Sequence, residues 1–205
     1  NTQNTQKIST NNDFETLLKS NTNKDIDWFF KTIINSREII DYKFTNVTKT
    51  KDSVSFVLKN KTNIAVPIPI YGIKNDTIVF KKWIEPKLND SIYTLKRNQA
   101  NKIVINFKNE VPEFNLRNNW KKLEGFYPNN RPIKFALIKD LEDPFYNQII
   151  YAPILTYNVY DGLSPGMRFH NKAILNRPFV YDINPTYSIK SKTVTGSAIF
   201  MVNKD

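Results

Sequence analysis

The sequence predicts a mainly β protein with an N-terminal helix pair, an immunoglobulin-like β-sandwich and then long antiparallel strands of the barrel type. From residue 39 onward the spacing of apolar residues changes from a helical period of about 3.6 to a strand period of 2. Strand-like segments then recur at roughly 8–12 residues, a spacing typical of sandwiches. The composition agrees, because 14 Phe and 10 Tyr accompany only 5 Gly.

Residues 1–38 are expected to hold a disordered, Asn-rich start and the helix pair. Asn12 and Glu15 have the spacing of a capping box at the start of the first helix. The second helix is predicted over residues 23–36, with Asp25 as its N-cap. Its buried stripe follows the i, i+3, i+4 pattern and consists of Ile26, Phe29, Phe30, Ile33 and Ile34.

Residues 39–110 are expected to form the β-sandwich. Six alternating segments predict its strands: 39–47, 52–60, 65–73, 77–83, 91–97 and 101–109. Pro67 and Pro69 stand two residues apart, so both side chains point the same way in an extended strand. Because an edge strand can dispense with the missing N–H groups, the two prolines predict an edge strand.

Residues 111–148 are predicted to be an irregular linker, because they carry four prolines and short polar-aromatic clusters. Residues 149–205 return to strands about ten residues long, in two hairpins, the first turning at 161–166. Such aromatic strands suit the start of an outer-membrane barrel and equally suit a soluble sheet. About four strands cannot close a barrel, since even small barrels need about eight.

The net charge of +11 invites a nucleic-acid interpretation, but the distribution of charge opposes it. Residues 1–110 carry 18 Lys/Arg against 11 Asp/Glu, and the remainder carries 12 against 8. Positive charge is therefore spread along the chain, and we expect no nucleic-acid partner. The sequence contains no apolar run of 18 residues, so it predicts no transmembrane helix. It contains no Cys, which excludes disulfide bonds and thiolate metal sites.

The sequence predicts no catalytic residue, no metal ligand and no cofactor of its own. His170 is the sole histidine, whereas a catalytic zinc takes two or three, so a strand or turn position is expected for it. Asp140, Glu142 and Asp143 have side chains suited to Ca²⁺ binding or glycoside chemistry. We favour the interpretation that these three carboxylates form a cluster at a turn before Pro144.

Three segments share the pattern of Asp, a hydroxyl residue and an aliphatic residue, and Ser53, Thr77 and Ser91 are the hydroxyl residues. The pattern resembles the O-glycosylation sequon of Bacteroidetes envelope proteins. Asp and Ser/Thr also end turns, and β-branched residues start strands, so turn-to-strand junctions explain the pattern equally simply.

The helix pair resembles the end of the catalytic domain in aminopeptidase-N-like zinc metallopeptidases (gluzincins). The matching positions are Asp13, Phe14, Lys24, Asp25, Asp27, Trp28, Phe29 and Phe30. The segment 111–120, "VPEFNLRNNW", resembles the end of the sandwich in Bacteroidetes members of that family. "NNRPIKF", "EDPFYNQ", "YNVYDGL" and "FHNK" resemble the start of the outer-membrane barrel appended to some flavobacterial members.

This resemblance implies that the chain is the non-catalytic scaffold and membrane-anchoring part of a peptide-cleaving enzyme. The family's zinc motif lies upstream of the helix pair, so zinc belongs to the parent enzyme and no catalytic residue carries over. Trp28, Phe29 and Phe30 are expected at the interface with the missing catalytic domain. The implied partners are that domain, the outer membrane and, through the parent, a peptide substrate; the implied location is the cell envelope.

The alternative is a non-enzymatic β-sandwich module of the cell envelope that binds a protein or a polysaccharide. Its exposed aromatic residues would be Trp83, Trp120, Phe126 and Tyr127, although core or interface packing explains each of them as well.

Overall fold

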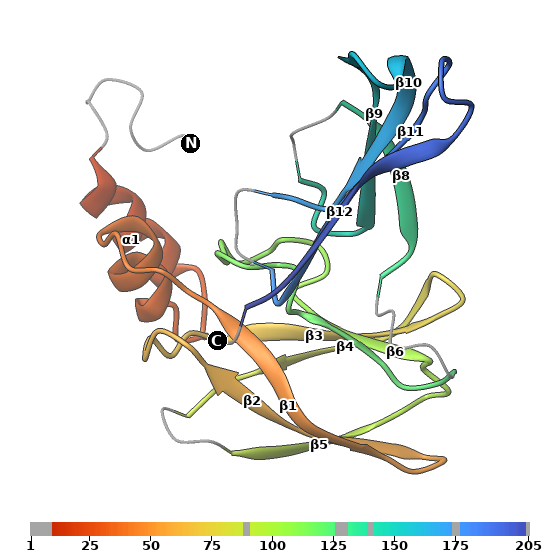
Figure 1. Ribbon diagram of the computed structural model, residues 1–205. Helices are drawn as coiled ribbons and strands as arrows, with labels where there is room; N and C mark the ends of the chain where they lie inside the picture. Colours follow the sequence, from red (N-terminus) through yellow and green to blue (C-terminus); the bar gives the residue numbers. More distant parts are fainter. Residues whose placement is uncertain (1–9, 88–90, 126–130, 139–141, 174–176, 204–205) are drawn as a thin grey trace. The chain divides into compact units, whose positions relative to one another are not determined.

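The computed structural model of the chain describes residues 10–87, 91–125, 131–138, 142–173 and 177–203. The predicted fold class is confirmed: these residues form two short helices and twelve strands in three sheets. The chain divides into two compact units, residues 1–126 and 127–205, and each is described by itself (Figure 1). The disordered start predicted for residues 1–11 lies mostly outside the described residues.

The first helix, α1 (Asn11–Ser20), begins earlier than the sequence predicts. Thr10 is its N-cap, and the Asp13 carboxylate accepts from the Thr10 backbone N–H at 2.9 Å. The Asp13 N–H in turn donates to the Thr10 hydroxyl at 3.3 Å. The capping box proposed at Asn12 and Glu15 is therefore wrong, and Glu15 instead pairs with Lys19 one turn later.

The second helix is shorter than the predicted 23–36. Helical structure starts at Asp27 and continues as η1 (Phe29–Ile34), a widened turn in which the Asn35 N–H donates to the Phe30 carbonyl at 2.9 Å. Asp25 is not the N-cap of this helix: it lies two residues before the helical start, and its carboxylate accepts from the Asp27 N–H at 2.9 Å in a turn that leads into the helix. The stripe residue Ile26 lies before the helix.

The rest of the first unit is a seven-stranded sandwich whose neighbouring strands are all antiparallel. One sheet has the order β1 (Tyr42–Lys49), β2 (Ser53–Asn60), β5 (Ile92–Lys96). The other has the order β4 (Thr77–Ile84), β3 (Ile68–Lys74), β6 (Lys102–Ile105), β7 (Trp120–Lys122). In an immunoglobulin constant domain the fourth strand joins the first sheet, whereas here β4 pairs with β3 in the second.

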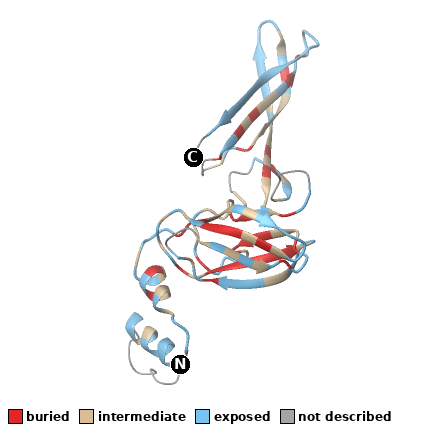
Figure 2. Cartoon of the chain, turned by 90° about the horizontal axis from the view of Figure 1, so that it is seen from below, coloured by how far each residue is buried: buried red, intermediate tan, exposed pale blue. Residues whose placement is uncertain are grey.

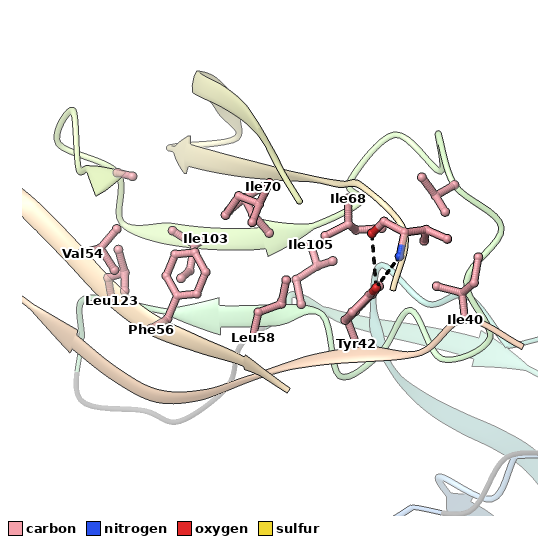
Figure 3. Packing of buried hydrophobic residues seen from close by; sticks show 14 residues of the cluster. Ile40, Tyr42, Val54, Phe56, Leu58, Ile68, Ile70, Ile103, Ile105 and Leu123 are labelled. Atoms are coloured by element: carbon pink, nitrogen blue, oxygen red, sulfur yellow. Dashed lines mark hydrogen bonds between the residues drawn. The ribbon is translucent and has the colours of Figure 1, made fainter. Parts of the chain in front are cut away.

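The hydrophobic core lies between these two sheets (Figure 3). Phe56 of β2 and Ile103 of β6 are fully buried and come from opposite sheets. Tyr42 is also fully buried, and its hydroxyl donates to the Ile64 carbonyl at 2.9 Å and accepts from the Val66 N–H at 3.0 Å. The phenol therefore ties β1 to the segment before β3 without leaving a buried polar atom unsatisfied.

The edge-strand prediction from the two prolines is wrong, because β3 pairs with β4 on one side and with β6 on the other. Pro69 stands opposite Asn106 at the point where β6 ends, and its carbonyl accepts from the Asn106 N–H at 2.8 Å. The Asn106 carbonyl accepts from the Asn109 N–H at 3.0 Å instead. The chain turns at Asn106, so β3 can lie inside the sheet although Pro69 has no N–H to donate.

The segment 111–148, predicted as an irregular linker, contains two short strands. β7 extends the sandwich sheet through the pair Val104–Trp120, so the first unit runs on to residue 126 rather than 110. β8 (Ile133–Leu137) lies in the second unit and pairs in parallel with β9 (Asn147–Asn158). Strands of three and five residues are too short to show a clear alternation.

The second unit is one sheet in the order β12 (Val194–Val202), β11 (Phe179–Tyr187), β10 (Gly162–His170), β9, β8. Within the described residues this sheet is open, with β12 and β8 as its edges. Its first hairpin turns before residue 162, not at 161–166. Asn158 accepts from the N–H groups of Tyr160 and Asp161 at 3.0 and 2.8 Å, and Gly162 supplies the positive φ that this tight turn requires.

Candidate functional site

The sheet of the second unit has one face that is apolar on every strand. Successive side chains of a strand point to opposite faces and paired residues share a face, so the strand register assigns each residue to one of two faces. We define the exposed apolar face as Ile133, Phe135, Leu137, Leu155, Tyr157, Leu163, Phe179, Tyr187, Val194, Phe200 and Val202. All of these side chains are exposed, in agreement with the pale blue strands of this unit in Figure 2.

The members of this face contact one another across strands. Leu163 of β10 stands opposite Tyr157 of β9, and Phe179 of β11 stands opposite Val202 of β12. The Phe179 and Phe200 rings stack with centroids 6.2 Å apart. The face is therefore continuous across the sheet rather than a set of isolated apolar residues.

The opposite face of the same sheet carries buried polar side chains beside two buried apolar ones, Ile150 and Val180. It exposes Ile199 and Met201 at the edge strand β12. Ser164, Thr186 and Ser188 are buried. Their hydroxyl groups form a chain in which Ser164 donates to Ser188 at 3.2 Å and the Thr186 and Thr195 oxygens lie 3.0 Å apart. Pairing within this network satisfies the buried hydroxyls.

A charged cluster lies on this same face around Asp182, whose side chain is buried. Arg168 binds it through two hydrogen bonds, with Nε to Oδ1 at 2.9 Å and Nη2 to Oδ2 at 2.6 Å. The Lys172 ammonium lies 2.8 Å from Oδ2. The hydrogen bonds from Arg168 hold the pKa of Asp182 well below its usual range, so this carboxylate stays ionised. His170, the last residue of β10, pairs with Asp182 in the strand register.

In a sheet that folds in water the apolar face is covered and the polar face meets solvent. Here the larger apolar face is exposed, and most of the polar groups, together with Ile150 and Val180, lie on the more protected face. Exposed apolar surface of this extent marks a site of contact with a partner or with lipid. The sequence contains the alternation, but the alternation alone does not say which face is covered.

The three residues expected at an interface with a catalytic domain lie in different surroundings. Phe30 is only 2 % exposed and packs edge-on against Phe14 and Phe29, at centroid distances of 5.8 and 5.3 Å. The Phe30 ring is therefore covered by residues of this chain. Phe29 and Trp28 are half-buried, and part of Trp28 packs against the sandwich core.

The first helix, α1, carries an exposed apolar face. Phe14, Leu17 and Leu18 share one side of this helix and all three are exposed. No residue of α1 is buried.

Of the four aromatic residues named for a binding module, the structure exposes Trp83 and buries Trp120. Phe126 and Tyr127 lie outside the described residues. Trp83 and Trp28 line a common pocket in the first unit, although they are 55 positions apart in the sequence (83 − 28).

The three candidate glycosylation residues all lie at the starts of strands. Thr77 is exposed and follows the turn Asn75–Asp76, whose two residues both have positive φ. Ser53 is half-buried, and its hydroxyl lies 2.8 Å from that of Thr50. Ser91 is half-buried just before β5. The turn explains why an Asp stands at position 76. Thr77 has the most accessible hydroxyl of the three candidate residues.

The acidic residues near Pro144 that the structure describes bind groups of this chain. Glu142 accepts from Arg177 at 3.0 Å, and Asp143 accepts from the Phe145 N–H at 3.1 Å. Asp140 lies outside the described residues. Within the described ranges no three His, Asp or Glu side chains lie close enough to hold a metal ion. With one His and no Cys in the sequence, the zinc of the implied parent does not fit this chain.

Sequence reasoning missed a half-buried carboxylate, Glu113, in the segment between β6 and β7. It accepts from the Tyr42 backbone N–H at 2.9 Å and from the Asn119 side-chain amide at 2.7 Å. Burial raises the pKa of Glu113 to about 7, and the nearby Asp41 charge adds to this rise. A Glu directly after a proline in a segment with few apolar residues gave no sequence signal of burial.

Neither helix in the part of the chain that the structure describes is long and apolar enough to cross a membrane. Comparisons with protein-family models, with curated proteins and with solved structures find no match.

Proposed function

We propose that this chain is the non-catalytic C-terminal part of an aminopeptidase-N-like zinc metallopeptidase of the cell envelope. In this proposal the sandwich is a scaffold beside the catalytic domain, and the second unit anchors the enzyme in the outer membrane. Zinc chemistry and peptide cleavage belong to the catalytic domain, which this chain does not contain. The exposed apolar face of the second sheet is the observation that carries the proposal.

The dimensions of this sheet suit a bilayer. Its strands β9 to β12 are 9 to 12 residues long. A tilted strand crosses the hydrocarbon core with about 9–11 residues, and such strands place apolar residues toward lipid and polar residues away from it. The register of the second sheet supplies that division, with Leu155 and Phe200 on one side and Ser164 and Asp182 on the other.

The proposal places a condition on the edge strand β12, whose nine residues are all exposed. In lipid every backbone N–H and C=O must be paired, so an open edge is not stable there. Further strands must therefore pair with β12 when the sheet is inserted.

The contact with a catalytic domain is assigned to α1. Its exposed residues Phe14, Leu17 and Leu18 form the apolar stripe by which a helix packs against a neighbouring domain. This stripe belongs to the segment that resembles the last helices of the family's catalytic domain.

Vesicle binding tests the membrane part of the proposal. The full chain is mixed with zwitterionic phosphatidylcholine vesicles, floated on a density gradient and washed with urea. Zwitterionic lipid is needed because a chain of net charge +11 adsorbs to anionic vesicles without insertion. We expect the chain to float and to resist the wash.

Two neighbouring positions of β9 supply matched variants. Leu155 lies on the exposed apolar face, whereas Thr156 lies on the opposite face. A Lys on the lipid side of a membrane strand costs about 2–4 kcal/mol near the bilayer midplane. Leu155→Lys should therefore reduce the floating fraction strongly, and Thr156→Lys should leave it nearly unchanged. Equal losses in the two variants, or a chain that stays in solution without detergent, would contradict the proposal.

A further inference from the structure

A pocket of about 720 Å³ lies in the first unit between the start of the second helix, the residue before β3 and the end of β4. Its lining residues are Lys24, Asp25, Ile26, Trp28, Pro67, Trp83 and Glu85. Its volume is within the range of small-molecule sites, about 300–1,000 Å³. Neither the scaffold role nor the membrane role proposed above makes use of this pocket.

Two tryptophans from separate elements supply the apolar surface of the pocket. Trp83 belongs to the edge strand β4 and is 43 % exposed, although it lies on a folded strand. Trp28 is held from behind, because part of its side chain packs against the sandwich core. Ile26 and Pro67 extend this surface, so a ligand meets indole and aliphatic faces that are already in place.

The charges around the pocket disfavour a charged ligand of either sign. Asp25 and Glu85 line it and repel an anion. Lys24 lines it as well, and the Lys81 ammonium already lies 5.3 Å from the centroid of the Trp83 ring. A cationic ligand would have to compete at the Trp83 ring with the Lys81 ammonium, which Glu110 holds through an ion pair at 2.6 Å. The charges around the pocket therefore favour a neutral ligand.

We infer that this pocket binds a neutral oligosaccharide. Sugar rings have apolar C–H faces that pack on indole rings, and their hydroxyls both donate and accept hydrogen bonds. The carboxylates of Asp25 and Glu85 accept hydrogen bonds, and the Lys24 ammonium donates them. The pocket therefore offers both kinds of partner beside two aromatic faces.

Titration of the full chain with oligosaccharides tests this inference. The probes are maltohexaose, cellohexaose and chitohexaose, followed by tryptophan fluorescence and by calorimetry. The chain is kept in an amine-oxide detergent, because alkyl maltosides and glucosides present the same chemistry as the probes. We expect a saturable change with at least one probe, since the pocket contains two of the three tryptophans of the chain.

Single substitutions locate the site. Trp83→Ala removes the exposed ring and should weaken binding roughly tenfold or more, because a buried aromatic contact is lost. Glu85→Gln removes one charged acceptor, leaves the packing intact and should weaken binding severalfold. Ile92→Ala is the control, because Ile92 is exposed on the other sheet of the sandwich and does not line the pocket.

Three outcomes would overturn the inference. One is the absence of a saturable response to all three probes. Another is binding that survives both Trp83→Ala and Glu85→Gln unchanged. The third is Trp83-dependent binding of oligolysine without binding of any sugar, which would identify a cation site. None of these outcomes bears on vesicle flotation, so this inference and the proposed function fail independently.

Discussion

The sandwich of the first unit and the sheet of the second unit use the same alternation of side chains in opposite ways. In the sandwich, Phe56 and Ile103 meet between two sheets and are fully buried. In the second sheet the protected side chains include Ser164 and Asp182, whereas large apolar residues such as Phe135 are exposed. Figure 2 shows the contrast as red strands in the sandwich and mostly pale blue strands in the second unit.

This difference shows that the same alternation of side chains gives opposite burial patterns, depending on which face of the sheet is covered. Each sheet of the sandwich covers the other, so the first unit contains its own core. The second sheet satisfies the buried polar groups of its more protected face internally and leaves its larger apolar face for another surface. Stability of the first unit should therefore depend on side-chain burial, and stability of the second should depend on its environment.

The largest effect is expected from truncating the same residue type in the two regions. Phe56 is 0 % exposed and Phe135 is 65 % exposed. Phe56→Ala should lower the free energy of unfolding of the first unit by about 3–5 kcal/mol, because it removes buried surface and leaves a cavity. Phe135→Ala should change the second unit by less than about 0.5 kcal/mol in the absence of lipid. Urea-dependent hydrogen exchange, resolved by peptide, measures each unit separately; equal losses would show that the apolar face is covered in water.

The next effect concerns pH, which should act on the two units in opposite directions. The folded-state pKa of Glu113, about 7, lies above the ordinary value of 4.5. The favourable contribution of its protonated form is present below pH 4.5 and is lost as pH rises toward 7. Since one pKa unit corresponds to about 1.4 kcal/mol, the loss is about 3 kcal/mol. Glu113→Gln should abolish this loss; a first unit whose stability is flat or rises over that interval would contradict the assignment.

Asp182 provides the opposite case in the second unit. Its pKa lies below the ordinary value of 3.8 because Arg168 and Lys172 bind the carboxylate. This contribution to stability is present above pH 3.8 and is lost as pH falls below it. Asp182→Asn should make exchange in the second unit insensitive to acid, and a persistent acid-dependent rise in exchange would assign the effect to other groups.

The smallest effect is expected from removing one phenol oxygen in each region. Tyr42→Phe leaves the buried N–H of Val66 without its 3.0 Å acceptor and should cost about 1–3 kcal/mol in the first unit. Tyr157 is exposed on the second sheet, so Tyr157→Phe should have almost no effect there. The same exchange measurement compares them, and a neutral Tyr42→Phe would show that water replaces the lost partner.

Alternation of apolar residues located the strands of the sandwich from β1 to β6, because a half-buried strand needs that pattern over several residues. It failed for β7, which has three residues and is recognised only through its pairing with β6. The prolines wrongly predicted that β3 is an edge strand, because the tolerance of β3 for Pro69 depends on Asn106, 37 positions later in the sequence (106 − 69). Asp25 was predicted as the N-cap, but the helix starts two residues later and the Asp25 carboxylate accepts from the Asp27 N–H in the preceding turn.

The candidate sites divide in the same way. The two faces of β9 could be assigned from its sequence, because successive side chains always point in opposite directions. The partial burial of Glu113 could not be predicted, since its partners Tyr42 and Asn119 come from strand β1 and from the residue before β7. The pocket between Trp28 and Trp83 likewise depends on the packing of a helix against a sandwich.

The sequence by itself determined the mainly β class, the N-terminal helices and the division of each strand into two faces, because these depend on neighbours a few residues apart. The tertiary structure decided which face is covered, which carboxylates are buried and which tryptophans meet. These features depend on contacts between residues distant in the sequence, and burial sets both the energy of an apolar side chain and the charge of an acidic one.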